Sequence, residues 1–129
     1  AAAKAKGKTK ILAVTVLTSL GHEELGQSGF AGSLADLVRL RAETSLAAGA
    51  DGIVCSPLET AFLRKAIGPK PLIVTPGIRP LESSRDDQTR TATPLAAVRA
   101  GADYIVVGRP ITKAASPVTA AREIADEIG

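Results

Sequence analysis

The chain has 129 residues, which suits one domain and is too short for two. Its net charge is only +3, and the lysines crowding its first ten residues are not interleaved with aromatic side chains, so we expect no nucleic-acid binding. The single cysteine, Cys55, excludes a disulfide framework within the chain and fits a reducing cytoplasm. No apolar run approaches the roughly 18 residues of a membrane span, and we expect no secretory leader. These features predict a cytoplasmic protein, with residues 1–129 forming a single domain that does not associate with membranes.

Apolar stretches rich in β-branched residues alternate along the chain with stretches of helical spacing. We predict strands at residues 11–17, 52–55, 71–75 and 104–107. We predict helices at about residues 33–48, 56–68, 93–101 and 116–128. The second helix has the clearest start, because Ser56 can cap it, Pro57 suits its first turn and Glu59 completes a capping box. The segments 76–92 and 108–115 are predicted to be irregular.

Four successive strand–helix units predict an α/β fold, a parallel sheet with helices packed outside it. An open doubly wound sheet and part of a (β/α)8 barrel both satisfy this order, and the chain has about half of the roughly 250 residues of a complete barrel. The phrase Ala-Gly-Ala-Asp occurs before the second and the fourth strand, at residues 48–51 and 100–103. This recurrence fits a barrel built from repeating units.

Glycine and arginine follow the third and fourth predicted strands closely, at the strand ends where parallel folds bind ligands. The pairs are Gly77 with Arg79 and Gly108 with Arg109. Glycine permits close backbone approach, and a guanidinium offers paired donors to phosphate oxygens, so we predict a phosphate site here. The alternative is that both arginines are ordinary surface residues.

The segment 76–92 predicts either a lid over a ligand or a solvated insertion, because loops of this length in compact folds are usually functional or disordered. Other polar residues favour structural roles. His22 lies among polar loop residues, and Cys55 at a strand end is expected to be buried packing. Asp51 and Asp103 precede strands and should lie at the end of the sheet away from any ligand.

Six phrases of the chain resemble the bacterial type of orotidine 5′-phosphate decarboxylase, in that family's order and spacing. They are AVTVLTS (13–19), GADGIVCS (49–56), VTPGIRP (74–80), DDQTR (86–90), TP (93–94) and GADYIVVGRPIT (101–112). The resemblance implies a (β/α)8 TIM barrel, of which this chain covers about the last four βα units. It also implies decarboxylation of orotidylate to UMP and CO2 in pyrimidine biosynthesis, a lyase reaction that uses neither metal nor cofactor.

The resemblance assigns roles to individual residues. Thr18 is similar to a nucleotide-contacting threonine of the family, and Arg79 to a substrate-contacting residue. Gln88 matches a lid glutamine that reaches the phosphate and the pyrimidine. Gly108 and Arg109 resemble the family's phosphate-binding pair. These five residues are therefore expected to bind orotidine 5′-phosphate or UMP.

The family's catalytic Asp-x-Lys-x-x-Asp motif does not occur in this chain, so no catalytic residue is expected in it. In the family, that motif belongs to the N-terminal half of the barrel. We therefore expect a phosphate- and nucleotide-binding half barrel that forms a homodimer or pairs with an N-terminal half. Such a half barrel would leave strand edges and apolar surface exposed, so in isolation it should dimerise or aggregate.

Two other functions are considered. One is a half barrel that binds a phosphorylated nucleoside without turning it over, which the absence of the catalytic motif favours for the chain by itself. The other is a related phosphate-sugar barrel enzyme with a different substrate. The lid residue Gln88 and the PGIR phrase at 76–79 argue against the latter.

Overall fold

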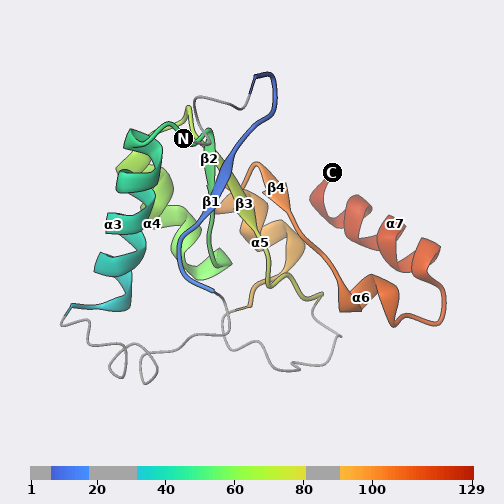
Figure 1. Ribbon diagram of the computed structural model, residues 1–129. Coiled ribbons are helices and arrows are strands. Elements are labelled where there is room, and N and C mark those ends of the chain that lie inside the picture. The colour runs from blue at the N-terminus through green and yellow to red at the C-terminus, as the bar shows by residue number, and fades with distance from the viewer. Residues whose placement is uncertain (1–6, 18–31, 81–90) are drawn as a thin grey trace.

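A four-stranded parallel sheet organises the computed structural model, which describes residues 7–17, 32–80 and 91–129 (Figure 1). The strands lie side by side in chain order, as β1 (Leu12–Val14), β2 (Gly52–Val54), β3 (Leu72–Thr75) and β4 (Tyr104–Ile105). The helices are α3 (Leu34–Ala47), α4 (Pro57–Ile67), α5 (Pro94–Arg99), α6 (Arg109–Thr112) and α7 (Pro117–Ile128). This order confirms the predicted alternation of parallel strands and helices. None of the helices in the described part of the chain is long and apolar enough to cross a membrane.

The two outer strands are shorter than the sequence pattern predicted. β1 ends at Val14 rather than at residue 17, and β4 ends at Ile105 rather than at residue 107. One ladder bond continues past each end, from Thr15 N to Val54 O (3.0 Å) and from Val106 N to Thr75 O (2.9 Å). The ladder stops there because the neighbouring strands turn away, into α4 and into the loop after β3.

Capping boxes, in which two side chains each accept a backbone N–H of the other residue, lie at the starts of α3 and α4. Ser56 and Glu59 form the predicted capping box of α4, in which the Glu59 carboxylate accepts the Ser56 backbone N–H at 3.1 Å. Ser33 and Asp36 form a second capping box at the start of α3. Each box satisfies backbone N–H groups that have no partner inside the helix, so both helices begin within a residue of the predicted position.

Two predictions of irregular structure need correction. The segment 108–115 contains the short helix α6, held by local bonds such as Thr112 N to Gly108 O (3.0 Å) and Lys113 N to Arg109 O (2.9 Å). The segment 76–92 is paired at its base, where Ile78 and Ala92 form a parallel β-bridge. The middle of that segment, residues 81–90, lies outside the described residues.

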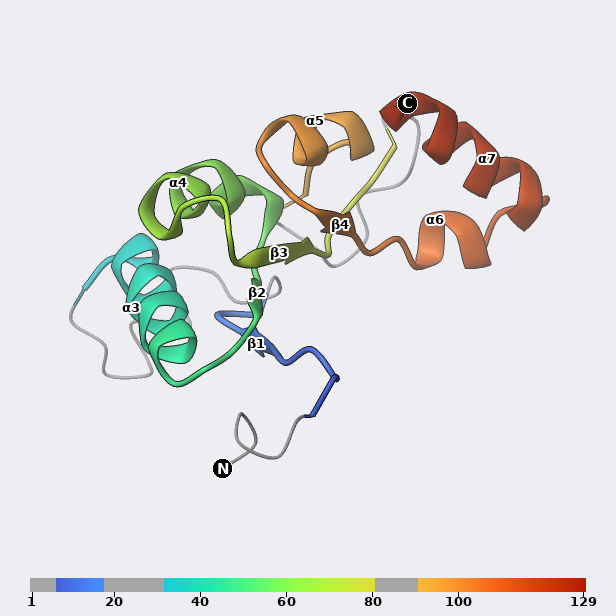
Figure 2. The same cartoon turned by 90° about the horizontal axis from the view of Figure 1, so that it is seen from above.

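The core lies between the sheet and the helices α3 and α4. Val38, Ile53, Leu63 and Ile73 are fully buried there, each from a different strand or helix. Figure 2 shows α3, α4 and α5 along one side of the curved sheet, with α7 beyond β4. α7 packs against α5 and α6. The helices therefore cover one face of the sheet.

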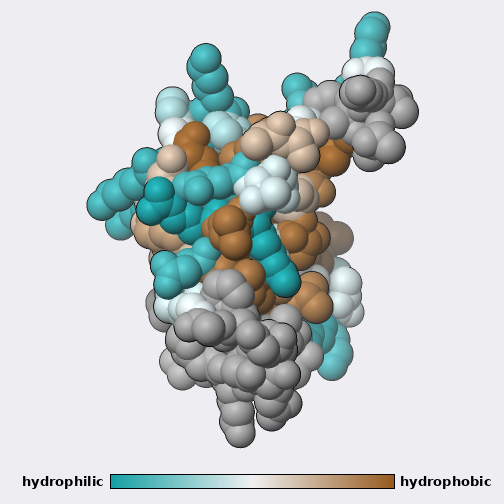
Figure 3. Space-filling view, turned by 60° about the vertical axis from the view of Figure 1, so that its left-hand side comes forward, coloured by the Kyte–Doolittle hydropathy of each residue, from teal (hydrophilic) through white to brown (hydrophobic). Residues whose placement is uncertain are grey.

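The opposite face of the sheet exposes apolar side chains. The register places Val14, Val54, Val74 and Tyr104 in one row across the four strands. Val14 is 57% exposed and Tyr104 is 61% exposed, which is unusual for residues in a parallel sheet. Apolar patches also interrupt the hydrophilic surface on the side shown in Figure 3. The sheet therefore has the surface expected of a barrel wall whose inner side is not filled.

The aspartates of the two Ala-Gly-Ala-Asp phrases form hydrogen bonds with the backbone at the N-terminal edge of the sheet. The Asp51 carboxylate accepts the backbone N–H of Ile11 at 2.8 Å, and the Asp103 carboxylate accepts that of Ile73 at 2.7 Å. Arg64 completes the second arrangement, because its Nη2 donates to Asp103 at 2.6 Å. Both aspartates thus link neighbouring strands at the end of the sheet away from the predicted phosphate site, as predicted.

Candidate functional site

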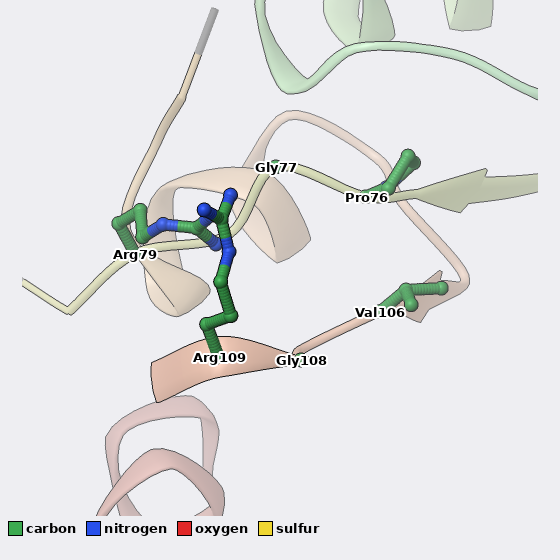
Figure 4. Close-up of a pocket in the computed structure, with 6 residues that line it drawn as sticks. All are labelled: Pro76, Gly77, Arg79, Val106, Gly108 and Arg109. Atoms are coloured by element: carbon green, nitrogen blue, oxygen red, sulfur yellow. The ribbon is translucent and has the colours of Figure 1, made fainter. Parts of the chain in front are cut away.

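Two arginines from neighbouring loops point into one pocket at the C-terminal edge of the sheet (Figure 4). Arg79 follows β3, and Arg109 begins α6 after β4. Their guanidinium groups approach each other across the pocket. The pocket measures about 230 Å³ and is lined by Pro76, Gly77, Arg79, Val106, Gly108 and Arg109.

The loop after β3 is shaped by a glycine and by its bridge to residue 92. Gly77 has a φ of 82°, in the left-handed region that other residues rarely adopt, so the chain can turn sharply here. Gly77 O then accepts the N–H of Ala92 (3.3 Å), and the Arg79 N–H donates to Ala92 O (2.9 Å). Ile78 is fully buried and anchors the turn in the protein interior. The backbone that carries Arg79 is therefore held from both sides.

Arg79 is charged but nearly buried, with 8% of its surface exposed. Its Nη1 donates to the carbonyl oxygen of Ile78 at 2.7 Å, which holds the guanidinium close to its own backbone. Burying a charge is costly unless the charge is paired or well hydrogen-bonded. An anion in the pocket would offer Arg79 acceptor oxygens of opposite charge, so the burial itself is consistent with a negatively charged ligand.

Gly108 keeps the facing wall of the pocket open. A Cβ atom built at this position would meet no other heavy atom within 4 Å. Protein packing therefore does not require a glycine at residue 108. Its lack of a side chain leaves the backbone accessible from the pocket, so a ligand can approach the start of α6 closely.

The charged side chains among the residues that line the pocket are all positive. Two arginines are among its six lining residues, and none of the six is acidic. A guanidinium binds phosphate or carboxylate through paired, charge-assisted hydrogen bonds. Two guanidinium groups that face one pocket suit a dianion such as a phosphate monoester better than a singly charged or neutral group.

The structure brings together three of the five residues predicted to bind substrate. Arg79 from the loop after β3 and the adjacent residues Gly108 and Arg109 after β4 line the same pocket. Thr18 and Gln88 lie outside the described residues. Gly77 and Arg79 follow the end of β3, as the sequence predicts, and both line the pocket.

Other residues at the site were not singled out from the sequence. Val106 lines the pocket, and its backbone N–H donates to Thr75 O at 2.9 Å. Thr75 is fully buried and directly precedes the lining residue Pro76. In the sequence, only their position could have indicated that these residues belong to the site, since both lie close to the predicted glycine–arginine pairs.

Cys55 is not placed for nucleophilic chemistry. It is 1% exposed, and burial raises the pKa of its thiol to about 11. A thiol with a raised pKa remains protonated and unreactive at neutral pH. The prediction that Cys55 is buried packing is therefore confirmed. Among the described residues, no group of three His, Cys, Asp or Glu side chains could hold a metal ion.

A sequence model of the orotidine 5′-phosphate decarboxylase / HUMPS family matches residues 1–124. The chain belongs to this family. A relative named orotidine 5′-phosphate decarboxylase from Methylobacterium sp. (strain 4-46) is 56% identical over 119 residues, covering 92% of this chain and 50% of the relative. One from Rhodopseudomonas palustris (strain BisA53) is 54% identical over 121 residues, covering 94% of this chain and 52% of the relative. The chain thus spans about half the length of the curated relatives it matches.

Solved structures give the same result for the fold. Orotidine 5′-phosphate decarboxylase from Lactobacillus acidophilus superimposes with a TM-score of 0.79 at 41% identity, covering 94% of this chain and 50% of that structure. The protein of the same name from Pyrococcus horikoshii OT3 gives 0.68 at 26% identity, covering 95% and 52%. The four parallel strands and their helices therefore correspond to half of the (β/α)8 barrel of this orotidine 5′-phosphate decarboxylase family.

Proposed function

We propose that this chain is the phosphate- and nucleotide-binding half of an orotidine 5′-phosphate decarboxylase. The observation that carries the proposal is the convergence of Arg79 and Arg109 on one pocket at the C-terminal edge of the sheet. TIM barrels commonly bind phosphate in the loops after their last two strands. The printed names of the relatives supply the substrate, orotidine 5′-phosphate.

In the proposed reaction, the bond between the pyrimidine ring and its carboxylate breaks, CO2 leaves, and a proton takes its place to give UMP. Arg79 and Arg109 would hold the phosphate dianion, with Gly108 allowing its close approach. Thr18 and Gln88 are proposed to contact the nucleotide, as the resemblance implies. Binding energy from the remote phosphate would be used at the pyrimidine. The groups that act on the carboxylate and supply the proton are proposed to lie outside this chain.

The bare face of the sheet supports a proposal about partners. We propose that further βα units cover the row that contains Val14 and Tyr104, contributed by an N-terminal half or by a second copy in a homodimer. Exposed apolar surface of this kind usually marks an interface. We place the protein in the cytoplasm, in line with its single, buried cysteine.

A second function, binding without turnover, applies to the chain by itself. It is favoured by the sequence, in which no aspartate is followed two residues later by a lysine. A half barrel of this kind would hold a phosphorylated nucleoside through the same two arginines. The two functions therefore share a binding site and differ only in whether CO2 is released.

The test is an orotidylate decarboxylation assay, followed by the absorbance change of the pyrimidine. The purified chain is expected to show no turnover alone and to gain activity when the N-terminal half of a relative is added. Arg109→Ala should abolish the restored activity, and Lys113→Ala, just beyond α6 and outside the pocket lining, should not. Turnover by the chain alone would contradict the proposed division of roles. Failure of the mixture to bind or convert orotidylate would contradict the function.

A further inference from the structure

Two buried threonines contact each other next to the strand end that leads into the arginine pocket. Thr75 is the last residue of β3 and Thr60 lies on α4, and both are fully buried with their Oγ atoms 3.3 Å apart. The Thr60 hydroxyl donates to Ser56 O at 3.2 Å. Because a hydroxyl carries one proton, Thr75 is left as the donor between the two threonines. The pair therefore ties the end of β3 to the first turn of α4.

Thr75 also joins the two walls of the pocket. The chain runs directly from Thr75 into Pro76 and Gly77, which line one wall. The carbonyl oxygen of Thr75 accepts the N–H of Val106 at 2.9 Å, and Val106 lines the other wall. Arg79 lies three residues after Pro76, and Arg109 lies three residues after Val106. A shift of Thr75 would thus move both arginine-bearing loops.

We propose that the Thr60–Thr75 hydroxyl pair is a positioning device that sets the separation of Arg79 and Arg109. The inference rests on the proposed binding of a phosphate monoester in this pocket. Neither threonine is among the lining residues, so the pair acts through the backbone of the two loops. Fully satisfied buried polar networks make their surroundings rigid, and small misplacements of binding groups weaken binding strongly.

Substitutions at Thr75 and a matched control separate positioning from general stability. Thr75→Val removes the hydroxyl and keeps the branched shape, and Thr75→Ser keeps the hydroxyl. Thr15→Val is the matched control, because Thr15 is also buried at a strand end and its Oγ donates to Val54 O at 3.0 Å. Thr15 does not adjoin the pocket lining, so its loss should affect stability without changing the pocket.

Two measurements are made on each variant of the full chain. Calorimetric titration with UMP measures binding, and amide hydrogen exchange of Val106 and Arg79 measures the two loops without ligand. Thr75→Val should weaken UMP binding about tenfold and speed exchange at both amides relative to the core amide of Ile53. Thr75→Ser should keep both properties at the parent level, and Thr15→Val should leave the exchange at Val106 and Arg79 unchanged. Thr60→Val should match Thr75→Val, and the double variant should add little.

Unchanged exchange at Val106 and Arg79 in Thr75→Val would overturn the inference, as would equal effects of Thr75→Val and Thr15→Val. If the parent chain binds no UMP, the proposed function fails, and the exchange data still decide whether the hydroxyl pair holds the loops. If the parent binds UMP and Thr75→Val binds it equally well, the inference fails while the proposed function stands.

Discussion

Single charged residues have different roles at the two ends of the sheet. At the C-terminal edge, Arg79 and Arg109 face a pocket whose six lining residues include no carboxylate. At the N-terminal edge, Arg64 pairs with Asp103 at 2.6 Å and also donates to the carbonyl oxygen of Pro71 at 2.8 Å. The first arrangement places two guanidinium groups at the proposed phosphate site. The second neutralises charge within the protein and links neighbouring loops.

The buried thiol of Cys55 predicts a specific pH dependence. Burial raises its pKa from 9.0 to about 11, so between these values the unfolded chain loses the thiol proton while the folded chain keeps it. The contribution to stability is therefore fully present below pH 9 and is lost as the pH rises towards 11. The loss should be about 2 kcal/mol at pH 11. Denaturant unfolding at pH 8 and pH 11 should show this loss in the parent chain and not in Cys55→Ala. An identical loss in both chains would contradict the assignment.

At the scale of strands and helices, local sequence signals predict where helices begin better than where strands end. The capping serines Ser33 and Ser56 act within three residues of themselves, so the sequence alone identified the start of α4 and came within a residue for α3. The ends of β1 and β4 depend on where neighbouring strands stop, which local pattern does not reveal. The convergence of Arg79 and Arg109 followed from parallel topology. The link between Thr60 and Thr75 joins a helix to a strand and had no local signal.

We expect alanine substitutions at Gly52 and Gly108 to have different effects on stability and on UMP binding. In Gly52→Ala, the new Cβ would clash with the backbone oxygen of Leu72, so β2 and β3 must shift. The loss of unfolding free energy should be about 1–3 kcal/mol, as for other overpacked cores. In Gly108→Ala the Cβ meets nothing within 4 Å, so stability should change little while UMP binding weakens. Thermal unfolding and UMP titration of both variants test this pair. Equal stability losses would contradict the reading of Gly108 as an open pocket wall.

At the scale of the whole molecule, the helices among the described residues cover one face of the sheet and leave the other face bare. It spans about half the length of its relatives, and half the length of the solved structures that it matches. Val14 and Tyr104 lie in the same row of the bare face and are both more than half exposed. A parallel sheet is normally covered on both faces, which is why we propose that further βα units cover this one.

The bare face predicts self-association of the chain. Analytical ultracentrifugation over a range of concentrations should show reversible dimers or larger species, because the apolar row is withdrawn from water in them. Val14→Ser combined with Tyr104→Ser should reduce association. Leu40→Ser is the control, since Leu40 is 55% exposed but lies on α3, away from the bare face. A parent chain that stays monomeric at all concentrations would contradict this prediction.

The most direct test of the central claim is to compare the binding of UMP and uridine to the chain by calorimetric titration. The two ligands differ only in the phosphate, which the pocket of Arg79 and Arg109 is proposed to hold. UMP should bind at least about tenfold more tightly than uridine, and Arg109→Ala should remove most of that difference. Equal affinity for the two ligands, or a preference that survives Arg109→Ala, would show that the pocket is not a phosphate site.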